Sequence, residues 1–465
     1  MGEMSFRRLR VPFCLCLTLL LLILLDFSTL SFANDLSEQE TQEVIKESMQ
    51  DLFTGKDFPP VLEKKQIVMR EMLKNGSLRK ETLTAMIEKI IVSVLNENST
   101  SRYILKEIPE RINALLSPYT EWEEMKEIVW RACSKLIADG EQLVIKMGTL
   151  APSGTPWLNV PETILIPRMA KFSNNKVVIK IFGGGVMGED TDILRKMDIG
   201  QLEGCGCTAL GILAASPETS ALLLPGMFRN YDEVDYITEK FRQRLDSYFM
   251  ERGYILAAII DTGFFCVFSK NKISGLADLK KQKVLTWFGI VETALYDELG
   301  IDATPVAVPE VASALSTGLA DTCLAPSAWM LGMQAYQYTN YYIRPAMLYS
   351  PAAVVVSVQL KDRFQEKFGL SETLANNLTE MLVYEVNDLE THWRQQVRVF
   401  EEKSLKAFEV KCGMKPVQLS SEDQEILEKA SLAVREKLSG KAFPKDFMEE
   451  MFEELDAYRA LGAER

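Results

Sequence analysis

The chain has 465 residues, and 65 acidic against 52 basic side chains give it a net charge of −13 at pH 7. Such a length, with 47% hydrophobic residues, is enough to bury a large core. The acidic balance argues against nucleic acid and anionic lipid as partners. His392 is the only histidine in the sequence, so no Ser/His/Asp or Cys/His arrangement can be built, and we expect neither catalytic residues nor an enzyme.

Residues 1–33 have the pattern of a secretory signal peptide. Three arginines precede an apolar run from Val11 to Leu25, and Ser31-Phe32-Ala33 provides a small-residue cleavage site. We therefore predict a periplasmic protein that is cleaved after Ala33. A leader retained as a membrane anchor is the alternative.

Residues 34–140 predict an all-helical domain. Apolar residues recur at i, i+3 and i+4 from Leu83 to Leu95 and again from Trp122 to Ile137. Helices of this length are marginal alone, so we expect them to pack together. Two roles stay open: a bundle that only decorates the protein, or a surface on which a partner protein docks.

Beyond the leader the sequence has six cysteines, at positions 133, 205, 207, 266, 323 and 412. Some could pair in an oxidising compartment, but sequence alone does not assign the connectivity. Cys205 and Cys207 have no second cysteine or histidine pair nearby, so we expect no metal site. The favoured interpretation is buried thiols that pack as small apolar groups.

From residue 141 the pattern changes to alternating strands and helices. Residues 143–150 predict a strand that enters a loop ending at Trp157, and residues 177–182 predict a second strand followed by a run of glycines. Glu189 and Asp190 start the next helix, where they suit the helix dipole and would repel a phosphate. We therefore expect no nucleotide and no other cofactor.

The stretch from Asp278 to Met330 predicts a parallel sheet. Three short apolar runs alternate with two helical patterns, and Gly300 and Gly318 stand where a helix needs a left-handed stop. Ligands bind outside the carboxyl ends of such strands. We therefore expect a ligand site near residues 285–287 and 324–326.

This stretch also resembles the solute-binding proteins of tripartite ATP-independent periplasmic (TRAP) transporters, the DctP type. The motifs that carry the resemblance are Asp278-Leu279-Lys280, Leu299-Gly300, Thr304-Pro305-Val306, Glu310-Val311, Ala314 to Gly318, Asp321 and Pro326. Other sequence motifs similar to those of the family occur from residue 141 to the C-terminus, but the resemblance does not cover residues 34–140.

The resemblance implies an α/β fold with two lobes, hinge strands and a long C-terminal helix, preceded by the all-α domain. Lobe one would span about 141–262 with a return near 352–390, and lobe two about 263–351. Such a protein captures a small-molecule ligand between the lobes and delivers it to TRAP membrane subunits, which use an ion gradient. No ATP site is implied in this chain.

Departures from the family pattern shape the predicted ligand. Members that bind carboxylates hold them with arginine, whereas this chain has Leu285 and Phe265 at the two arginine positions and Leu324-Ala325 where the family has polar residues. Neighbouring tryptophans add aromatic surface. The predicted ligand-binding residues are Trp157, Phe265, Leu285, Trp287, Leu324, Ala325 and Trp329.

An unpaired buried carboxylate costs several kcal/mol, on the order of 3–5, so these residues favour an uncharged or largely apolar ligand. Trp157 could be a cleft wall or plain core. The alternative function is a periplasmic interaction or scaffold protein that uses the helical domain and whose cleft has degenerated.

Overall fold

The computed structural model describes residues 140–463 apart from 288 and 345, and also residues 127, 130, 131, 134, 135 and 137. The predicted signal peptide and nearly all of the predicted helical domain lie outside the described residues. The chain divides into two compact units, of which the first comprises 1–143, 168–178 and 361–384, and the second 144–167, 179–360 and 385–465. The predicted domain limits differ from this division and stay a prediction.

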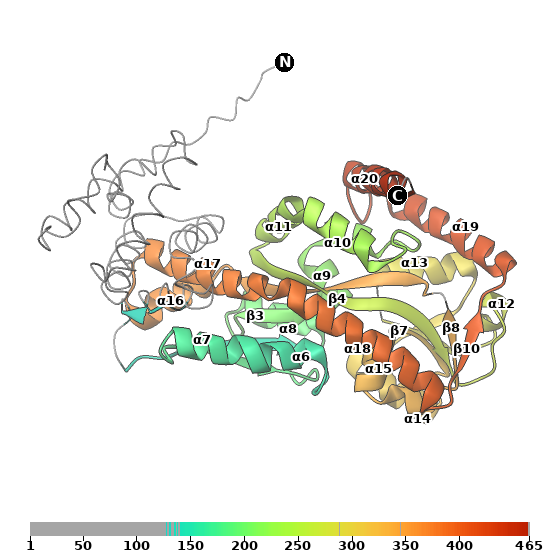
Figure 1. Cartoon of the computed structure of the whole chain (residues 1–465), viewed down its shortest axis with the longest axis horizontal. Coiled ribbons are helices and arrows are strands. Elements are labelled where there is room, and N and C mark those ends of the chain that lie inside the picture. Colours follow the sequence, from blue (N-terminus) through green and yellow to red (C-terminus); the bar gives the residue numbers. More distant parts are fainter. Residues whose placement is uncertain are drawn as a thin grey trace, which may run out of the picture. The chain divides into compact units, whose positions relative to one another are not determined.

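Ten strands alternate with helices in the described part of the chain (Figure 1). The strands are β1 (Leu143–Thr149), β2 (Val177–Phe182), β3 (Gly204–Cys207), β4 (Tyr254–Ser269), β5 (Val284–Thr286), β6 (Ala303–Pro305), β7 (Thr322–Pro326), β8 (Tyr341–Arg344), β9 (Leu348–Ser357) and β10 (Lys415–Gln418). The helices that surround the sheet are α6 (Pro156–Val160), α7 (Ile166–Phe172), α8 (Asp190–Asp198), α9 (Ala209–Ala215), α10 (Tyr231–Lys240), α11 (Arg242–Met250), α12 (Leu276–Leu279), α13 (Ile290–Leu299), α14 (Val311–Thr317), α15 (Ser327–Gly332), α16 (Leu360–Phe368), α17 (Glu372–Asp388), α18 (Glu390–Val410), α19 (Ser421–Leu438) and α20 (Lys445–Ala463). Short π- or 3-10 turns are η3 (Pro161–Leu165), η4 (Pro217–Leu223), η5 (Val308–Glu310) and η6 (Ala335–Tyr338).

The strands form a mixed sheet in the order β2-β1-β3-β9-β4-β7-β5-β6, with β8 joined to β4 and β10 joined to β8. At one end β1 and β3 run parallel, and at the other end β5 runs parallel to both β6 and β7. The parallel arrangement predicted for residues 278–330 is therefore confirmed. Antiparallel pairs involving β9 and β4 join the two ends.

Strand β4 is the longest, with 16 residues, and belongs to both ends of the sheet. It pairs with β9 from Tyr254 to Phe265 and with β7 from Phe265 to Ser269. Two register shifts, one of them between Asp261 and Gly263, interrupt its pairing with β9. A single strand thus bends at these irregularities.

Several local signals in the sequence set the helix ends as expected. Gly300 and Gly318 adopt φ of 64° and 76° after α13 and α14. Ser420 accepts a hydrogen bond from the backbone of Asp423 and completes a capping box at the start of α19. The helical stretch predicted from residue 371 to 411 divides instead into α17 and α18, with Leu389 between them.

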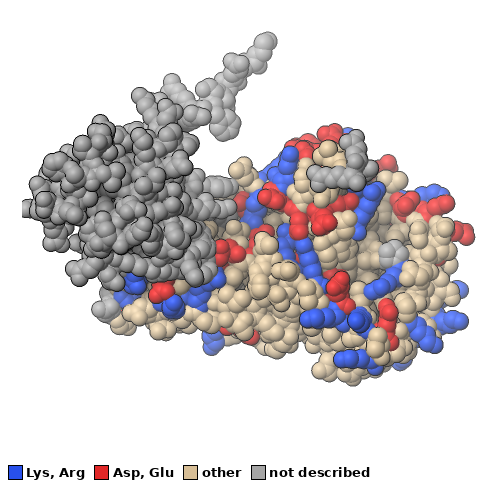
Figure 2. All heavy atoms as spheres, in the orientation of Figure 1, with Lys and Arg blue, Asp and Glu red and all other residues tan. Residues whose placement is uncertain are grey.

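Helix α18 passes across β4 and also packs on α6 and α15, so it contacts both ends of the sheet (Figure 1). Figure 2 shows Lys and Arg side chains interspersed with Asp and Glu over the coloured part of the molecule, which is typical of a solvated surface. Among the helices of the described residues, none combines the length and the apolar character needed to cross a bilayer.

Candidate ligand-binding pocket

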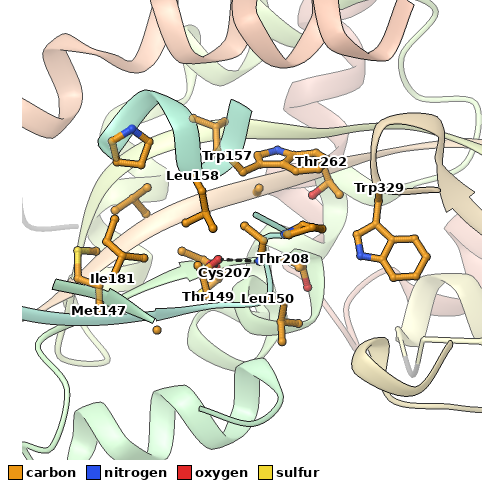
Figure 3. Close-up of a pocket in the computed structure, with 18 of the residues that line it drawn as sticks. Met147, Thr149, Leu150, Trp157, Leu158, Ile181, Cys207, Thr208, Thr262 and Trp329 are labelled. Atoms are coloured by element: carbon orange, nitrogen blue, oxygen red, sulfur yellow. Dashed lines mark hydrogen bonds between the residues drawn. The ribbon is translucent and has the colours of Figure 1, made fainter. Parts of the chain in front are cut away.

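A pocket lies within the second unit at the carboxyl ends of β1 and β3, beside the long strands β4 and β9 (Figure 3). It encloses about 790 Å³ of space between atoms, including solvent at its opening. The residues that line it are Met147, Gly148, Thr149, Leu150, Ala151, Pro152, Trp157, Leu158, Pro161, Leu165, Ile181, Gly206, Cys207, Thr208, Ile260, Thr262, Trp287, Val308, Trp329, Ala352, Val354 and Trp393.

The lining is apolar apart from a few hydroxyl, thiol and indole groups. All of its members belong to the described residues, and none is a lysine, arginine, histidine, aspartate or glutamate. Two hydroxyl hydrogens are already used: Thr149 Oγ1 donates to the Gly206 carbonyl at 2.8 Å, and Thr262 Oγ1 donates to the Pro351 carbonyl at 2.9 Å. The walls therefore offer a ligand mainly apolar contact.

Aromatic rings form much of one side. The Trp287 ring lies 5.1 Å from the Trp329 ring and 5.5 Å from the Phe265 ring, both in edge-to-face geometry. Trp157 lies on α6, and its indole nitrogen donates to the Asp261 carbonyl at 2.8 Å. Trp157 is therefore both a pocket wall and a structural contact.

The structure brings only some of the predicted ligand-binding residues together. Trp157, Trp287 and Trp329 line the pocket, and Phe265 lines a smaller adjoining cavity that shares Trp287. The remaining three predicted positions, Leu285, Leu324 and Ala325, are fully buried inside β5 and β7 and do not line this pocket.

The structure places the two leucines, Leu285 and Leu324, in the buried interior of β5 and β7. Leu285 pairs with Thr304 of β6 on one side and with Cys323 of β7 on the other, so it lies inside the sheet between two strands. That these predicted residues contact a ligand stays a prediction.

The buried carboxylate of Asp190 positions one edge of the pocket. Its Oδ2 accepts from the Thr208 backbone N (2.9 Å), the Thr208 hydroxyl (2.6 Å) and the Gly211 backbone N (3.1 Å). Complete burial raises the pKa of Asp190 to about 6 in spite of these bonds. The third lining hydroxyl, that of Thr208, is thus committed as well.

Cys205 and Cys207 lie beside Asp190, and the three ligand atoms fall within 4.8 Å of one another. A structural zinc site takes four such ligands, and one oxygen of Asp190 is already saturated by N–H and O–H donors. Burial raises the pKa of both thiols, so they stay protonated at neutral pH. The prediction of buried thiols is confirmed for Cys205, Cys207, Cys266 and Cys323.

Behind the pocket, ionic contacts fasten α18 to the bend of β4. The fully buried Asp261 accepts from the Tyr349 hydroxyl and from Arg398 Nε, each at 2.7 Å. The same guanidinium binds both oxygens of Asp235 on α10, again at 2.7 Å. One arginine thus holds three elements in register.

Glu401, one turn further along α18, adds a second contact to the bend. It accepts a hydrogen bond from the Phe264 backbone N at 3.2 Å and another from the Tyr231 hydroxyl. Burial raises the pKa of Glu401 to about 7. Gly263 has φ of 119°, and a Cβ placed there would lie 3.2 Å from the Glu401 oxygens, so this position requires glycine.

Trp393 on α18 and the threonines at the strand ends are lining residues that the sequence did not reveal. A tryptophan in a long amphipathic helix is most simply core, and no local signal shows that α18 crosses the sheet at the pocket. Thr149 ends β1 and Thr208 follows β3, so both stand at carboxyl strand ends, where ligands of α/β sheets bind.

Comparison with solved structures shows the fold. The sugar acid binding protein of Advenella mimigardefordensis, in complex with galactonate, is 20% identical with a TM-score of 0.62, over 69% of this chain and 99% of that one. A TRAP periplasmic solute-binding protein of Haemophilus influenzae with bound L-gulonate is 16% identical with a TM-score of 0.59, over 68% and 99%. The predicted two-lobed α/β fold is confirmed by these likenesses.

Sequence relatives agree with this result. A solute-binding protein of Verminephrobacter eiseniae is 25% identical over 195 residues, which are 42% of this chain and 58% of that protein's length. A solute-binding protein of Chromohalobacter salexigens is 22% identical over 241 residues, 51% of this chain and 70% of that protein. Residues 147–441 match the family model DctP, described as bacterial extracellular solute-binding protein, family 7. Since that match spans more than half of the chain, the chain belongs to the DctP family of bacterial solute-binding proteins.

Proposed function

We propose that this protein is an extracytoplasmic receptor of a TRAP-type secondary transporter that binds an uncharged, largely apolar small molecule. The observation that carries the ligand class is the absence of any charged side chain from the described lining of the pocket. Members of the family are receptors and not enzymes. In this proposal residues 1–33 export the chain and residues 34–140 form a separate helical domain.

The ligand class sets this chain apart from its structural neighbours, whose bound ligands include galactonate, L-gulonate and galacturonate. Each of those ligands carries a carboxylate. Here an entering carboxylate would meet apolar walls, and an unpaired buried charge costs on the order of 3–5 kcal/mol. Apolar contact contributes about 25 cal/mol per Å², so a ligand with ring or chain surface gains where a sugar acid loses.

Ligand release and capture would use the bend in β4 and the antiparallel strand β9 beside it. Closure of the two ends of the sheet around the ligand hides it from water and presents a surface that membrane subunits recognise. Those subunits, and the ion gradient that they use, are separate from this chain.

Native mass spectrometry of protein purified without refolding tests the proposal, because a co-purified ligand reports its own mass and chemistry. A neutral, poorly water-soluble compound is the expected result. Thermal unfolding with added D-galacturonate or L-gulonate supplies the opposing test. A rise in melting temperature with either sugar acid, saturating at micromolar concentration, would overturn the ligand class but leave the receptor role intact.

A further inference from the structure

Three of the four tryptophans that line the pocket have an indole N–H without an acceptor among the described residues. They are Trp287, Trp329 and Trp393, with exposed fractions of 7%, 5% and 4%. The fourth, Trp157, donates to the Asp261 carbonyl. All four rings border the same pocket, so the lack of an acceptor distinguishes these three tryptophans from Trp157 within one site.

An unpaired N–H in such a place is costly. A buried polar group without a partner costs about 1–3 kcal/mol. Each of these nitrogens is covered by neighbouring atoms in this arrangement, so water does not reach it either. Figure 3 shows Trp329 at one end of the pocket, with the nitrogen-bearing edge of its indole turned toward the other labelled residues.

Contacts between the aromatic rings can satisfy only some of the three unpaired indole N–H groups. Trp287 and Trp329 meet edge to face at 5.1 Å, so one of them can direct its N–H at the other's ring. Both cannot do so at once. For Trp393 no ring contact is found within the described part of the chain, and its N–H stays unpaired.

The other polar side chains of the lining do not supply an acceptor for these indoles. The hydroxyls of Thr149, Thr208 and Thr262 donate their hydrogens to protein oxygens, and although their oxygens keep lone pairs, none of them pairs with an indole N–H of the three tryptophans. The lining also holds no carboxylate or amide oxygen. An acceptor oxygen on the ligand would satisfy the indole N–H groups.

We infer that the ligand is an uncharged ring or chain compound that bears carbonyl or ether oxygens, and that the indoles of Trp287, Trp329 and Trp393 donate to those oxygens. This inference rests on the proposed function and names its ligand class. A bound ligand of this kind supplies the acceptor that the three N–H groups lack. Closure around a pure hydrocarbon leaves them unpaired.

A matched set of probes tests the inference. 2-Acetylnaphthalene carries one ketone oxygen, 2-ethylnaphthalene has nearly the same shape without it, and 2-naphthoate replaces the ketone by a carboxylate. Affinities are measured by titration calorimetry on the full chain. A net hydrogen bond contributes about 0.5–1.5 kcal/mol, so the ketone is expected to bind about 2- to 13-fold more tightly than the hydrocarbon. The naphthoate should bind more weakly than either.

Tryptophan-to-phenylalanine variants identify the donors. Trp393→Phe, Trp329→Phe and Trp287→Phe each keep an aromatic ring but remove the N–H. At least one of them should reduce the affinity ratio of ketone to hydrocarbon to about 1. Trp157→Phe is the matched control: it lowers affinity for both probes, but the ratio should stay at the wild-type value because its N–H binds Asp261.

The indole region of a nitrogen–proton NMR spectrum gives an independent readout, since the chain has six tryptophans. Ketone binding should move the indole N–H signals of the donors downfield, and hydrocarbon binding should not. Equal affinity for ketone and hydrocarbon would overturn this inference and leave the apolar receptor in place. Tightest binding of the naphthoate would overturn the proposed ligand class itself, and with it this inference.

Discussion

The Trp157 indole nitrogen lies 2.8 Å from the backbone carbonyl oxygen of Asp261, and this hydrogen bond ties a wall of the pocket to the bend of β4. The Asp261 side chain is held from the other side by Arg398 and Tyr349. The position of the pocket wall therefore depends on an ionic network that itself makes no contact with the pocket.

Asp261→Asn should destabilise the protein by about 3 kcal/mol. The substitution removes the charge that faces Arg398 at 2.7 Å and Arg394 at 3.6 Å, and breaking a buried ion pair leaves uncompensated charge. Urea unfolding followed by circular dichroism measures the change. Glu450→Gln is the control, since its pair with Arg244 is 55% exposed on the carboxylate side and should contribute less than about 1 kcal/mol. Equal losses in the two variants would contradict the structural role of Asp261.

Glu292→Gln should flatten the pH dependence of stability. Burial raises the pKa of Glu292 from 4.5 to about 7, against the hydrogen bond from the Trp287 backbone N. The folded state therefore holds a proton that the unfolded state has lost, so this stabilisation is complete below pH 4.5 and disappears as pH rises toward 7.

The measurement is the free energy of unfolding at pH 5, 6, 7 and 8 for wild type and Glu292→Gln. Each unit of pKa difference is worth about 1.4 kcal/mol at full effect. Wild type should lose more stability than the variant between pH 5 and 7, while both change alike above pH 8. Parallel curves throughout would show that Glu292 does not titrate in this range.

Leu285→Ala should cost about 2–5 kcal/mol of stability, because the side chain is fully buried in the centre of β5. Leu285→Arg should fail to fold at room temperature, since the fully buried position between β6 and β7 gives an unpaired guanidinium no access to water. This reverses the expectation from sequence, in which position 285 stands in open cleft. A folded, carboxylate-binding Leu285→Arg protein would restore that expectation.

Gly263→Ala should be more destabilising than an ordinary left-handed glycine substitution. A methyl group there has both an unfavourable φ of 119° and a contact with the Glu401 carboxylate at 3.2 Å. Gly154→Ala is the matched control, because φ there is 79° but nothing lies within 4 Å of the new carbon. Thermal unfolding should rank wild type above Gly154→Ala and Gly154→Ala above Gly263→Ala; the reverse order of the variants would exclude crowding by Glu401.

The sequence was most informative where short-range rules apply. Gly300 and Gly318 are fixed by backbone geometry, and both adopt the left-handed conformation predicted for them. The parallel arrangement of the strands at residues 278–330 followed from the alternation of strand and helix patterns. These features depend on neighbours a few residues away, which a sequence shows directly.

The pocket was harder to predict because it depends on contacts between distant segments. Trp393 lines the pocket only because α18 crosses β4. The two elements are distant in the sequence: Phe264 and Glu401, which are joined by a hydrogen bond, lie 137 residues apart. Leu285 and Trp287 lie two residues apart, yet Leu285 is inside β5, whereas Trp287 follows the end of that strand and lines the pocket. A resemblance aligned to within two positions does not separate a wall residue from a core residue.

The continuity of β4 has a consequence for kinetics. Because backbone hydrogen bonds join β4 to β9 and β7 on both sides of its register shifts, the ends of the sheet cannot separate by the movement of a loop alone. Opening must store elastic twist in the strand, concentrated at the register shift beside Gly263. Amide hydrogens on either side of that shift should accordingly resist deuterium exchange for as long as those in the centre of the sheet. The amide hydrogens at the shift should exchange early, because bending is concentrated there.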